Sequence, residues 1–260
     1  MMTKLQIKAD LSYRLVVPCA ILVQIEAAVT PGQTVTPADL DIGPDDRRSV
    51  IPAHAGIGTR LWTTQQEQLE ISYSAQVAID RADPDLAALP ATPLPELPGE
   101  AVPYLFNSLY CSVSAFDQIV AGEFTGLNGG PLMAAMSDYI GQTMTYGLDS
   151  DNAQNDAEAS FAARKGVCRD YAHILISMAR SANIPARFAS TYAPDVEPQD
   201  FHAVAEVFLD GGWHLVDPTG MARASDMAVI GIGRDATDVS FLTAFGNIEM
   251  VDQRVRVSRL

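Results

Sequence analysis

Residues 201–220 have the sequence FHAVAEVFLDGGWHLVDPTG, which predicts two strands joined by a tight turn. An Asp-Gly pair between apolar runs is typical of a two-residue type I′ hairpin, so Asp210 and Gly211 are the expected loop. Counting outward from that loop makes His202 and Asp217 diagonal neighbours on one face, with Cα atoms roughly 7–8 Å apart. A carboxylate at that distance can orient an imidazole.

Two other histidines are poor candidates for the same role. His214 alternates along its strand with residues of the opposite face, so it points away from Asp217. His173 follows Cys168 by five residues, which is about 140° around a helix, and it therefore faces away from that cysteine.

A helical pattern begins at Cys168, just after Gly166. Its apolar positions recur at helical spacing: Cys168, Ala172, Leu175, Ile176 and Ala179. A cysteine in the first turn lies near free N–H groups and the positive end of the helix dipole, which favour the nucleophilic thiolate. Arg169 would support that effect and Asp170 would oppose it in part.

Each of these three positions also has an ordinary structural interpretation. Cys168 would be a buried core thiol, His202 a half-buried sheet histidine and Asp217 a turn carboxylate. The combination of a thiol at a helix start with a His and an Asp on one hairpin face favours a Cys-His-Asp triad. The remaining cysteines, Cys19 and Cys111, lack such a context and are assigned to packing.

The sequence resembles the transglutaminase-like superfamily of papain-fold enzymes, in particular its bacterial branch of cysteine-protease-like proteins. Three blocks carry the resemblance: GVCRDYAHILISMARSANIPARFASTY at 166–192, the hairpin block at 201–220, and GRDATDVSFLTAFG at 233–246. The resemblance implies that Cys168 is the nucleophile, His202 the base and Asp217, within an Asp-Pro-Thr motif, the orienting carboxylate. It implies a peptide or amide substrate and a thioester intermediate.

The chain departs from the family at Val204, where the family often has Trp after His-Ala. This leaves the substrate preference open, and so does the choice of acceptor between water and an amine. The backbone N–H of Cys168 would stabilise the oxyanion, together with a second donor that the sequence does not identify.

The predicted fold class is α+β, with a boundary at a proline-rich stretch. Residues 1–81 alternate apolar and polar positions and predict an antiparallel, sandwich-like β domain. Residues 82–103 hold six of the 16 prolines and predict a stiff extended connector. Residues 104–260 are the expected papain-like transglutaminase core, with helices over 104–124 and 132–146 leading into an antiparallel sheet.

The charge and the cysteine count limit the partners and the compartment. A net charge of −15 disfavours nucleic acid and anionic membranes. Three widely spaced cysteines suit neither a disulfide framework nor a zinc site, so a cytoplasmic protein with reduced thiols is expected. No metal, cofactor or membrane-spanning segment is expected, and the oligomeric state is not indicated.

Two further functions compete with an amide-cleaving thiol enzyme. One is a non-catalytic binding or scaffold protein on the same fold, which the intact Cys-His-Asp set disfavours. The other is an amine-accepting transglutaminase, for which the sequence offers no calcium-site motif.

Overall fold

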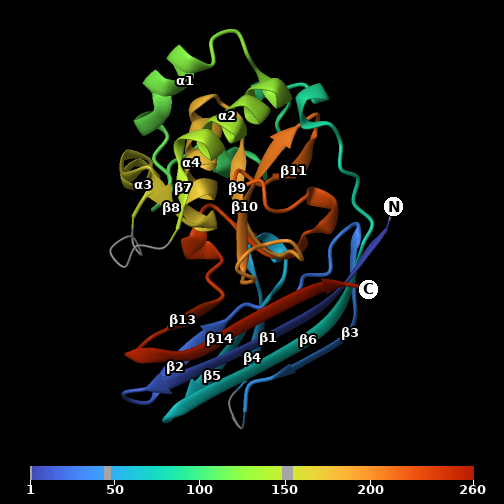
Figure 1. Cartoon of the computed structure of the whole chain (residues 1–260), viewed down its shortest axis with the longest axis vertical. Helices are drawn as coiled ribbons and strands as arrows, with labels where there is room; N and C mark the ends of the chain where they lie inside the picture. The colour runs from blue at the N-terminus through green and yellow to red at the C-terminus, as the bar shows by residue number, and fades with distance from the viewer. Residues whose placement is uncertain (1, 44–47, 148–154) are drawn as a thin grey trace.

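The computed structural model describes residues 2–43, 48–147 and 155–260, which form two layers of β-strands below a lobe that contains the α-helices (Figure 1). The predicted α+β class is confirmed. No helix within these ranges is long and apolar enough to cross a membrane.

The lower part consists of two four-stranded antiparallel sheets. The first has the order β14-β1-β6-β3 and contains β1 (Thr3–Leu15), β3 (Gln33–Asp41), β6 (Gln68–Ile79) and β14 (Ile248–Arg259). The second has the order β13-β2-β5-β4 and contains β2 (Cys19–Val23), β4 (Ser49–Pro52), β5 (Thr59–Gln65) and β13 (Leu242–Ala244). Alternate residues of β1, among them Leu5 and Ile7, are buried in a core with β2, β5 and β6. The strand periodicity of this segment is thus confirmed.

The upper lobe is built on an antiparallel sheet of order β11-β10-β9-β12. Its strands are β9 (Ala186–Tyr192), β10 (His202–Leu209), β11 (Gly212–Val216) and β12 (Ala228–Gly233). Helix α4 (Cys168–Ser181) packs against β9 and β10. The other elements of the lobe are α1 (Asp117–Glu123), α2 (Gly129–Thr143), α3 (Ala157–Ala163) and the parallel pair β7 (Thr145–Tyr146) and β8 (Lys165–Gly166). Short 3-10 turns are η1 (His54–Gly56), η2 (Leu86–Ala88), η3 (Leu94–Glu96), η4 (Val102–Leu105), η5 (Ser114–Phe116), η6 (Ala224–Asp226) and η7 (Ala236–Asp238).

The C-terminal strand lies elsewhere than the sequence analysis expected. The catalytic domain was predicted to contain all of 104–260, but β14 pairs with β1 in the lower sheet, and β13 pairs with β2. Val255 lies opposite Ala9 and Val257 opposite Ile7, and all four side chains are buried. Without β14, strand β1 would be a long unpaired edge. The division of the chain into separate domains stays a prediction.

The proline-rich stretch 82–103 contains two 3-10 turns and the start of a third, and it packs on the lobe. The Pro90 carbonyl accepts a hydrogen bond from the Asp210 N–H at 3.0 Å, and the Leu89 carbonyl accepts one from the Gly130 N–H at 2.8 Å. Hydrogen bonds therefore join this stretch to the hairpin tip and to α2.

The helix expected over 104–124 is much shorter in the structure. Only Asp117–Glu123 is α-helical there, whereas the helix expected over 132–146 corresponds to α2 at Gly129–Thr143. The Asn107 side-chain oxygen accepts a hydrogen bond from the Val113 N–H at 2.7 Å and stabilises a loop in place of the first turns.

Candidate active site

The predicted hairpin is confirmed in its turn and in its register. Asp210 and Gly211 have φ values of 50° and 72°, which are the left-handed conformations that a type I′ turn requires. Leu209 lies opposite Gly212, and the pairs further from the turn follow the expected count. Because the register is set at the turn, the side chains at the open end of the hairpin are placed by sequence spacing alone.

His202 and Asp217 meet at that open end. His202 is the first residue of β10, and Asp217 follows the last residue of β11. The His202 Nε2 and Asp217 Oδ2 atoms are 2.9 Å apart, and the two side chains are 0% and 1% exposed. Burial alone would raise the pKa of Asp217, but hydrogen bonds from His202 and Thr219 lower it.

The Asp217 carboxylate is held by the loop that follows it. Its Oδ1 accepts hydrogen bonds from the Thr219 N–H at 2.9 Å and from the Thr219 hydroxyl at 2.7 Å. Its Oδ2 accepts a further one from the Ala222 N–H at 2.9 Å. The threonine of the Asp-Pro-Thr motif therefore orients the carboxylate that contacts His202.

The pKa of His202 is high for a buried imidazole. Burial lowers the pKa of His202, but the hydrogen bond to Asp217 and the neighbouring Cys168 thiol outweigh burial and raise the pKa to about 10. Its Nδ1 is buried and has no hydrogen-bond partner in the part of the chain that the structure describes. The imidazole ring thus donates its Nε2–H to Asp217, and its Nδ1 is the nitrogen that can interact with Cys168.

Helix α4 begins at Cys168, as the sequence predicted. The buried Asp170 carboxylate folds back and accepts a hydrogen bond from the Val167 N–H at 2.9 Å, which caps the first turn. Asp170 also accepts a hydrogen bond from the Arg169 guanidinium at 2.9 Å, so its charge is engaged there. A Cβ at Gly166 would lie 2.7 Å from Asp170 Oδ2, and the residue before the cap therefore has no side chain.

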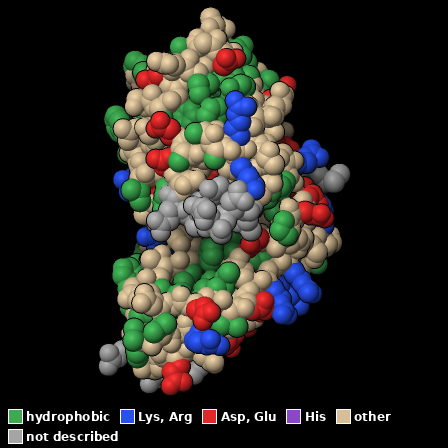
Figure 2. Space-filling view, turned by 60° about the vertical axis from the view of Figure 1, so that its left-hand side comes forward, with side chains coloured by type: hydrophobic (Ala, Val, Ile, Leu, Met, Phe, Trp, Pro, Cys, Tyr) green, Lys and Arg blue, Asp and Glu red, His purple; other side chains and the backbone are tan. Residues whose placement is uncertain are grey.

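Cys168 and His202 open into one cavity of about 650 Å³. Figure 2 shows the hollow between the lobe and the lower β layers, with hydrophobic side chains on its inner surface. Its aromatic wall includes Tyr110, Tyr146, Phe188, Phe201 and Phe241. Strands of both parts of the molecule line the cavity, because β14 contributes Gln253 and β13 contributes Thr243.

Tyr146 is a site residue that the sequence analysis missed. Strand β7 runs parallel to β8 and places Tyr146 opposite Gly166, two residues before Cys168. Tyr146 and Cys168 both line the cavity, and Cys168 is the neighbour that most affects the pKa of the Tyr146 phenol. Burial and the negative charge of Cys168 raise the pKa of Tyr146, so the phenol keeps its proton. The β7–β8 pairing joins segments twenty residues apart, and no local pattern indicates it.

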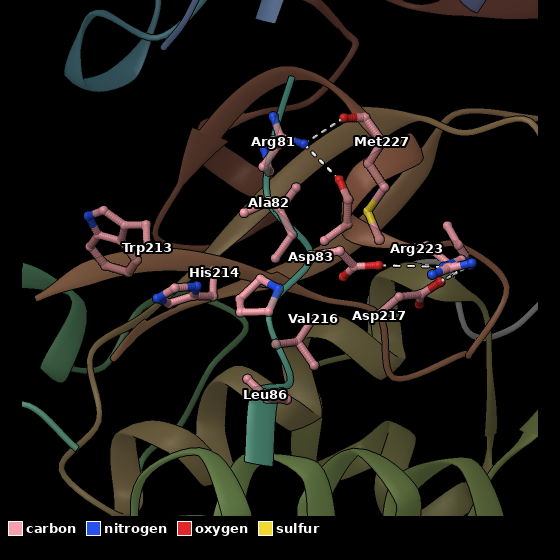
Figure 3. A pocket seen from close by; sticks show the side chains of 14 residues that line it. Arg81, Ala82, Asp83, Leu86, Trp213, His214, Val216, Asp217, Arg223 and Met227 are labelled. Carbon is pink, nitrogen blue, oxygen red and sulfur yellow. Dashed lines mark hydrogen bonds and ion pairs between the residues drawn. The ribbon is translucent and has the colours of Figure 1, made fainter. Parts of the chain in front are cut away.

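The other histidines lie outside the cavity that contains Cys168. His214 contacts the Leu209 carbonyl through Nε2 at 3.1 Å and lines a second cavity of about 400 Å³ (Figure 3). His173 is fully buried, stacks on Tyr110 and accepts a hydrogen bond from a backbone N–H through Nε2 at 3.2 Å. His54 contacts the Tyr104 hydroxyl through Nε2 at 3.1 Å.

The remaining predicted positions are structural. Cys19 and Cys111 are buried, and burial raises the pKa of Cys111 to about 12. Val204, which stands where the family often has Trp, is fully buried beside Ala189 and Leu215 and does not line the cavity. Within the described ranges, no three His, Cys, Asp or Glu side chains form a group that could hold a metal ion.

Comparisons with known proteins identify related sequences. Residues 119–218, a span that contains Cys168, His202 and Asp217, match the family model of the transglutaminase-like superfamily. A stretch of 86 residues is 35% identical to an uncharacterized protein of Mycobacterium leprae (strain TN), covering 29% of this chain and 30% of that protein.

The whole fold also matches a solved structure. The chain is similar to a protein described as a putative cysteine protease from Cytophaga hutchinsonii, with a TM-score of 0.93 and 28% identity over 100% of this chain and 91% of that one. The periplasmic domain of TgpA from Pseudomonas aeruginosa gives a TM-score of 0.44 and 15% identity over 85% and 91% of the two chains. The family match and the first structure support a cysteine-type enzyme. Residues 119–218 are therefore similar to the core domain of the transglutaminase-like superfamily.

Proposed function

We propose that the protein is a thiol-dependent hydrolase that cleaves an amide or peptide bond through a thioester on Cys168. The observation that supports it is the buried hydrogen bond between His202 and Asp217, which presents the second imidazole nitrogen to Cys168 inside a cavity. A scaffold protein would gain nothing from a desolvated ion pair beside a thiol at a helix start.

The first half of the reaction forms the thioester. The Cys168 sulfur, as a thiolate beside the protonated His202, attacks the carbonyl carbon of the substrate and converts its oxygen to an oxyanion. His202 then donates its proton to the nitrogen, the carbon–nitrogen bond breaks, and the amine leaves. Asp217 stabilises the imidazolium and holds the ring in one orientation.

The second half returns the enzyme to its resting state. A water molecule attacks the thioester carbon while the neutral His202 removes one of its protons. The carbon–sulfur bond breaks, the carboxylic acid leaves, and the proton remains on the imidazole beside the regenerated thiolate. An amine in place of water would give transfer instead of hydrolysis.

Two donors would stabilise the oxyanion in both steps. The Cys168 N–H lies at the start of α4 and has no partner within the helix. The protonated Tyr146 hydroxyl neighbours the same N–H and is the second donor in this mechanism.

The histidine assignment is tested by comparing two alanine variants. His202→Ala should lower kcat/KM for a cleavable peptide by about a thousandfold or more, because the base and proton donor is lost. The His214 side chain lines the second cavity and not the cavity that contains Cys168 and His202. His214→Ala should therefore keep nearly full activity. Both variants should be compared at equal thermal stability. A larger loss in His214→Ala, or turnover that survives in His202→Ala and Cys168→Ala alike, contradicts the proposal.

The nucleophile is tested by thiol labelling. Brief iodoacetamide treatment at neutral pH, followed by peptide mass spectrometry, should place alkylation on Cys168. Cys111 should remain unlabelled because burial keeps its thiol protonated, and Cys19 because it is buried. His202→Ala should slow the labelling of Cys168. Labelling of Cys19 or Cys111 ahead of Cys168 would refute the assignment.

The two buried histidines should titrate in opposite directions. His202, with its pKa raised to about 10, should stay protonated across pH 6–9, and His173, with its pKa lowered to about 3 by burial, should stay neutral. NMR of the imidazole Cε1–H signals measures both. The stabilising effect of the His202 pair is complete below about pH 6.5, the ordinary value, and should fade as pH rises toward 10.

Asp217→Asn provides the control for that titration. It removes the charge that raises the pKa of His202 while the burial that lowers it remains, so the His202 midpoint should fall. The His173 signal should not move. An unchanged His202 midpoint would show that Asp217 is not its electrostatic partner.

Tyr146→Phe tests the second oxyanion donor. The change removes one hydroxyl and keeps the ring, so kcat should fall by about a hundredfold with little change in KM. Tyr139→Phe, in the aromatic cluster with Phe124 and Phe161, is the matched control and should leave kcat unchanged. A rise in KM alone would assign Tyr146 to substrate binding instead.

A further inference from the structure

Asp200 and Gln253 form a polar site on the wall of the cavity that the proposed chemistry does not use. Asp200 lies two residues before His202 in the loop that leads into β10, and Gln253 belongs to β14 of the lower sheet. Both side chains line the cavity that contains Cys168. The site therefore joins the lobe to the lower β layer next to the reacting groups.

The orientation of the Gln253 amide is fixed by Asp200. Gln253 Nε2 donates a hydrogen bond to Asp200 Oδ1 at 2.6 Å. The reverse orientation would set the amide oxygen against the carboxylate. Gln253 Oε1 consequently points elsewhere, and this buried oxygen has no hydrogen-bond partner among the described residues. The amide therefore serves to hold the Asp200 carboxylate in place through its N–H group.

The Asp200 carboxylate is half-buried and has no cationic partner among the described residues. Its Oδ1 accepts from Gln253 and from the Phe201 N–H at 2.7 Å, whereas no Lys or Arg in the described ranges forms an ion pair with it. Burial raises the pKa of Asp200, as expected for a carboxylate that has lost water without gaining a cation. Arg169, the cation nearest Cys168 on the cavity wall, is paired with Asp170.

We propose that Asp200 and Gln253 select substrates that carry a cationic side chain, Lys or Arg, close to the scissile bond. This inference rests on the proposed amide cleavage. A protonated amine or guanidinium supplies several N–H donors and a positive charge, which match the Asp200 carboxylate on the cavity wall.

The surroundings of the pair suit a long cationic side chain. Phe201 stacks on Phe241 with ring centroids 4.6 Å apart, and both rings line the same cavity. Aromatic faces accommodate the methylene stem of Lys or Arg and attract its charged end. The net charge of −15 also favours the approach of cationic peptides. The wall of the cavity thus combines aromatic rings with a carboxylate.

The test compares peptides that differ only in this charge. Quenched fluorescent octapeptides of alanine and phenylalanine are prepared with a single Lys or norleucine at each position in turn. Norleucine keeps the aliphatic stem and removes the ammonium group. The wild-type protein should show, at one position, a kcat/KM for Lys at least tenfold above that for norleucine, as expected for one charge-assisted hydrogen bond.

Two acid-to-amide variants locate the origin of the preference. Asp200→Asn should reduce the Lys to norleucine ratio to about one. Asp195→Asn, in the same loop but exposed and ion-paired with Arg259, should keep the ratio of the wild type. Cys168→Ala protein should still bind the preferred Lys peptide more tightly than its norleucine partner in a calorimetric titration, since the preference does not depend on turnover.

The outcomes separate this inference from the proposed function. Cys168-dependent cleavage with equal rates for Lys and norleucine, or a preference that persists in Asp200→Asn, overturns the selectivity and leaves the hydrolase intact. Absence of any Cys168-dependent cleavage overturns the proposed function. If added n-butylamine appears in the product and no peptide position prefers Lys, the cation is an acyl acceptor and the inference is wrong.

Discussion

The buried pair of His202 and Asp217 is the interaction on which the arrangement of the site depends. Two ionisable groups with almost no solvent exposure are stable only when their charges and hydrogen bonds are matched. The Thr219 hydroxyl and the backbone N–H groups of Thr219 and Ala222 complete the shell of the carboxylate. The loop after β11 must therefore fold back so that its N–H groups reach the Asp217 carboxylate. The hairpin must also pair in the one register that places His202 next to Asp217.

The thiol reaches this pair through packing of a helix on the sheet. Helix α4 lies across β9 and β10 with a nearly continuous buried face, so its first residue comes to the open end of the hairpin. The Asp170 cap and the missing side chain at Gly166 shape the turn that leads into Cys168. The apolar core thus sets the position of Cys168, and the cap sets its local backbone conformation.

The lower β layers take part in the cavity although they supply none of the three candidate residues Cys168, His202 and Asp217. Strand β14 returns from the lobe to pair with β1, and in doing so it places Gln253 against Asp200. In the mechanism proposed here, the chemistry belongs to the lobe and substrate selection to its junction with the sheets. This separation would let one catalytic arrangement serve different substrates through changes at the junction.

The sequence by itself determined those parts of the site that depend on local spacing. The type I′ turn at Asp210 and Gly211 set the hairpin register, and the helix start set the place of Cys168, so the three candidate residues could be named from counting. Tertiary structure alone decided the partners that lie far apart in the chain, namely Tyr146 beside Cys168 and Gln253 beside Asp200. Their contacts arise from β7 pairing with β8 and β14 pairing with β1, and strand pairing over long separations leaves no mark in the local periodicity of either strand.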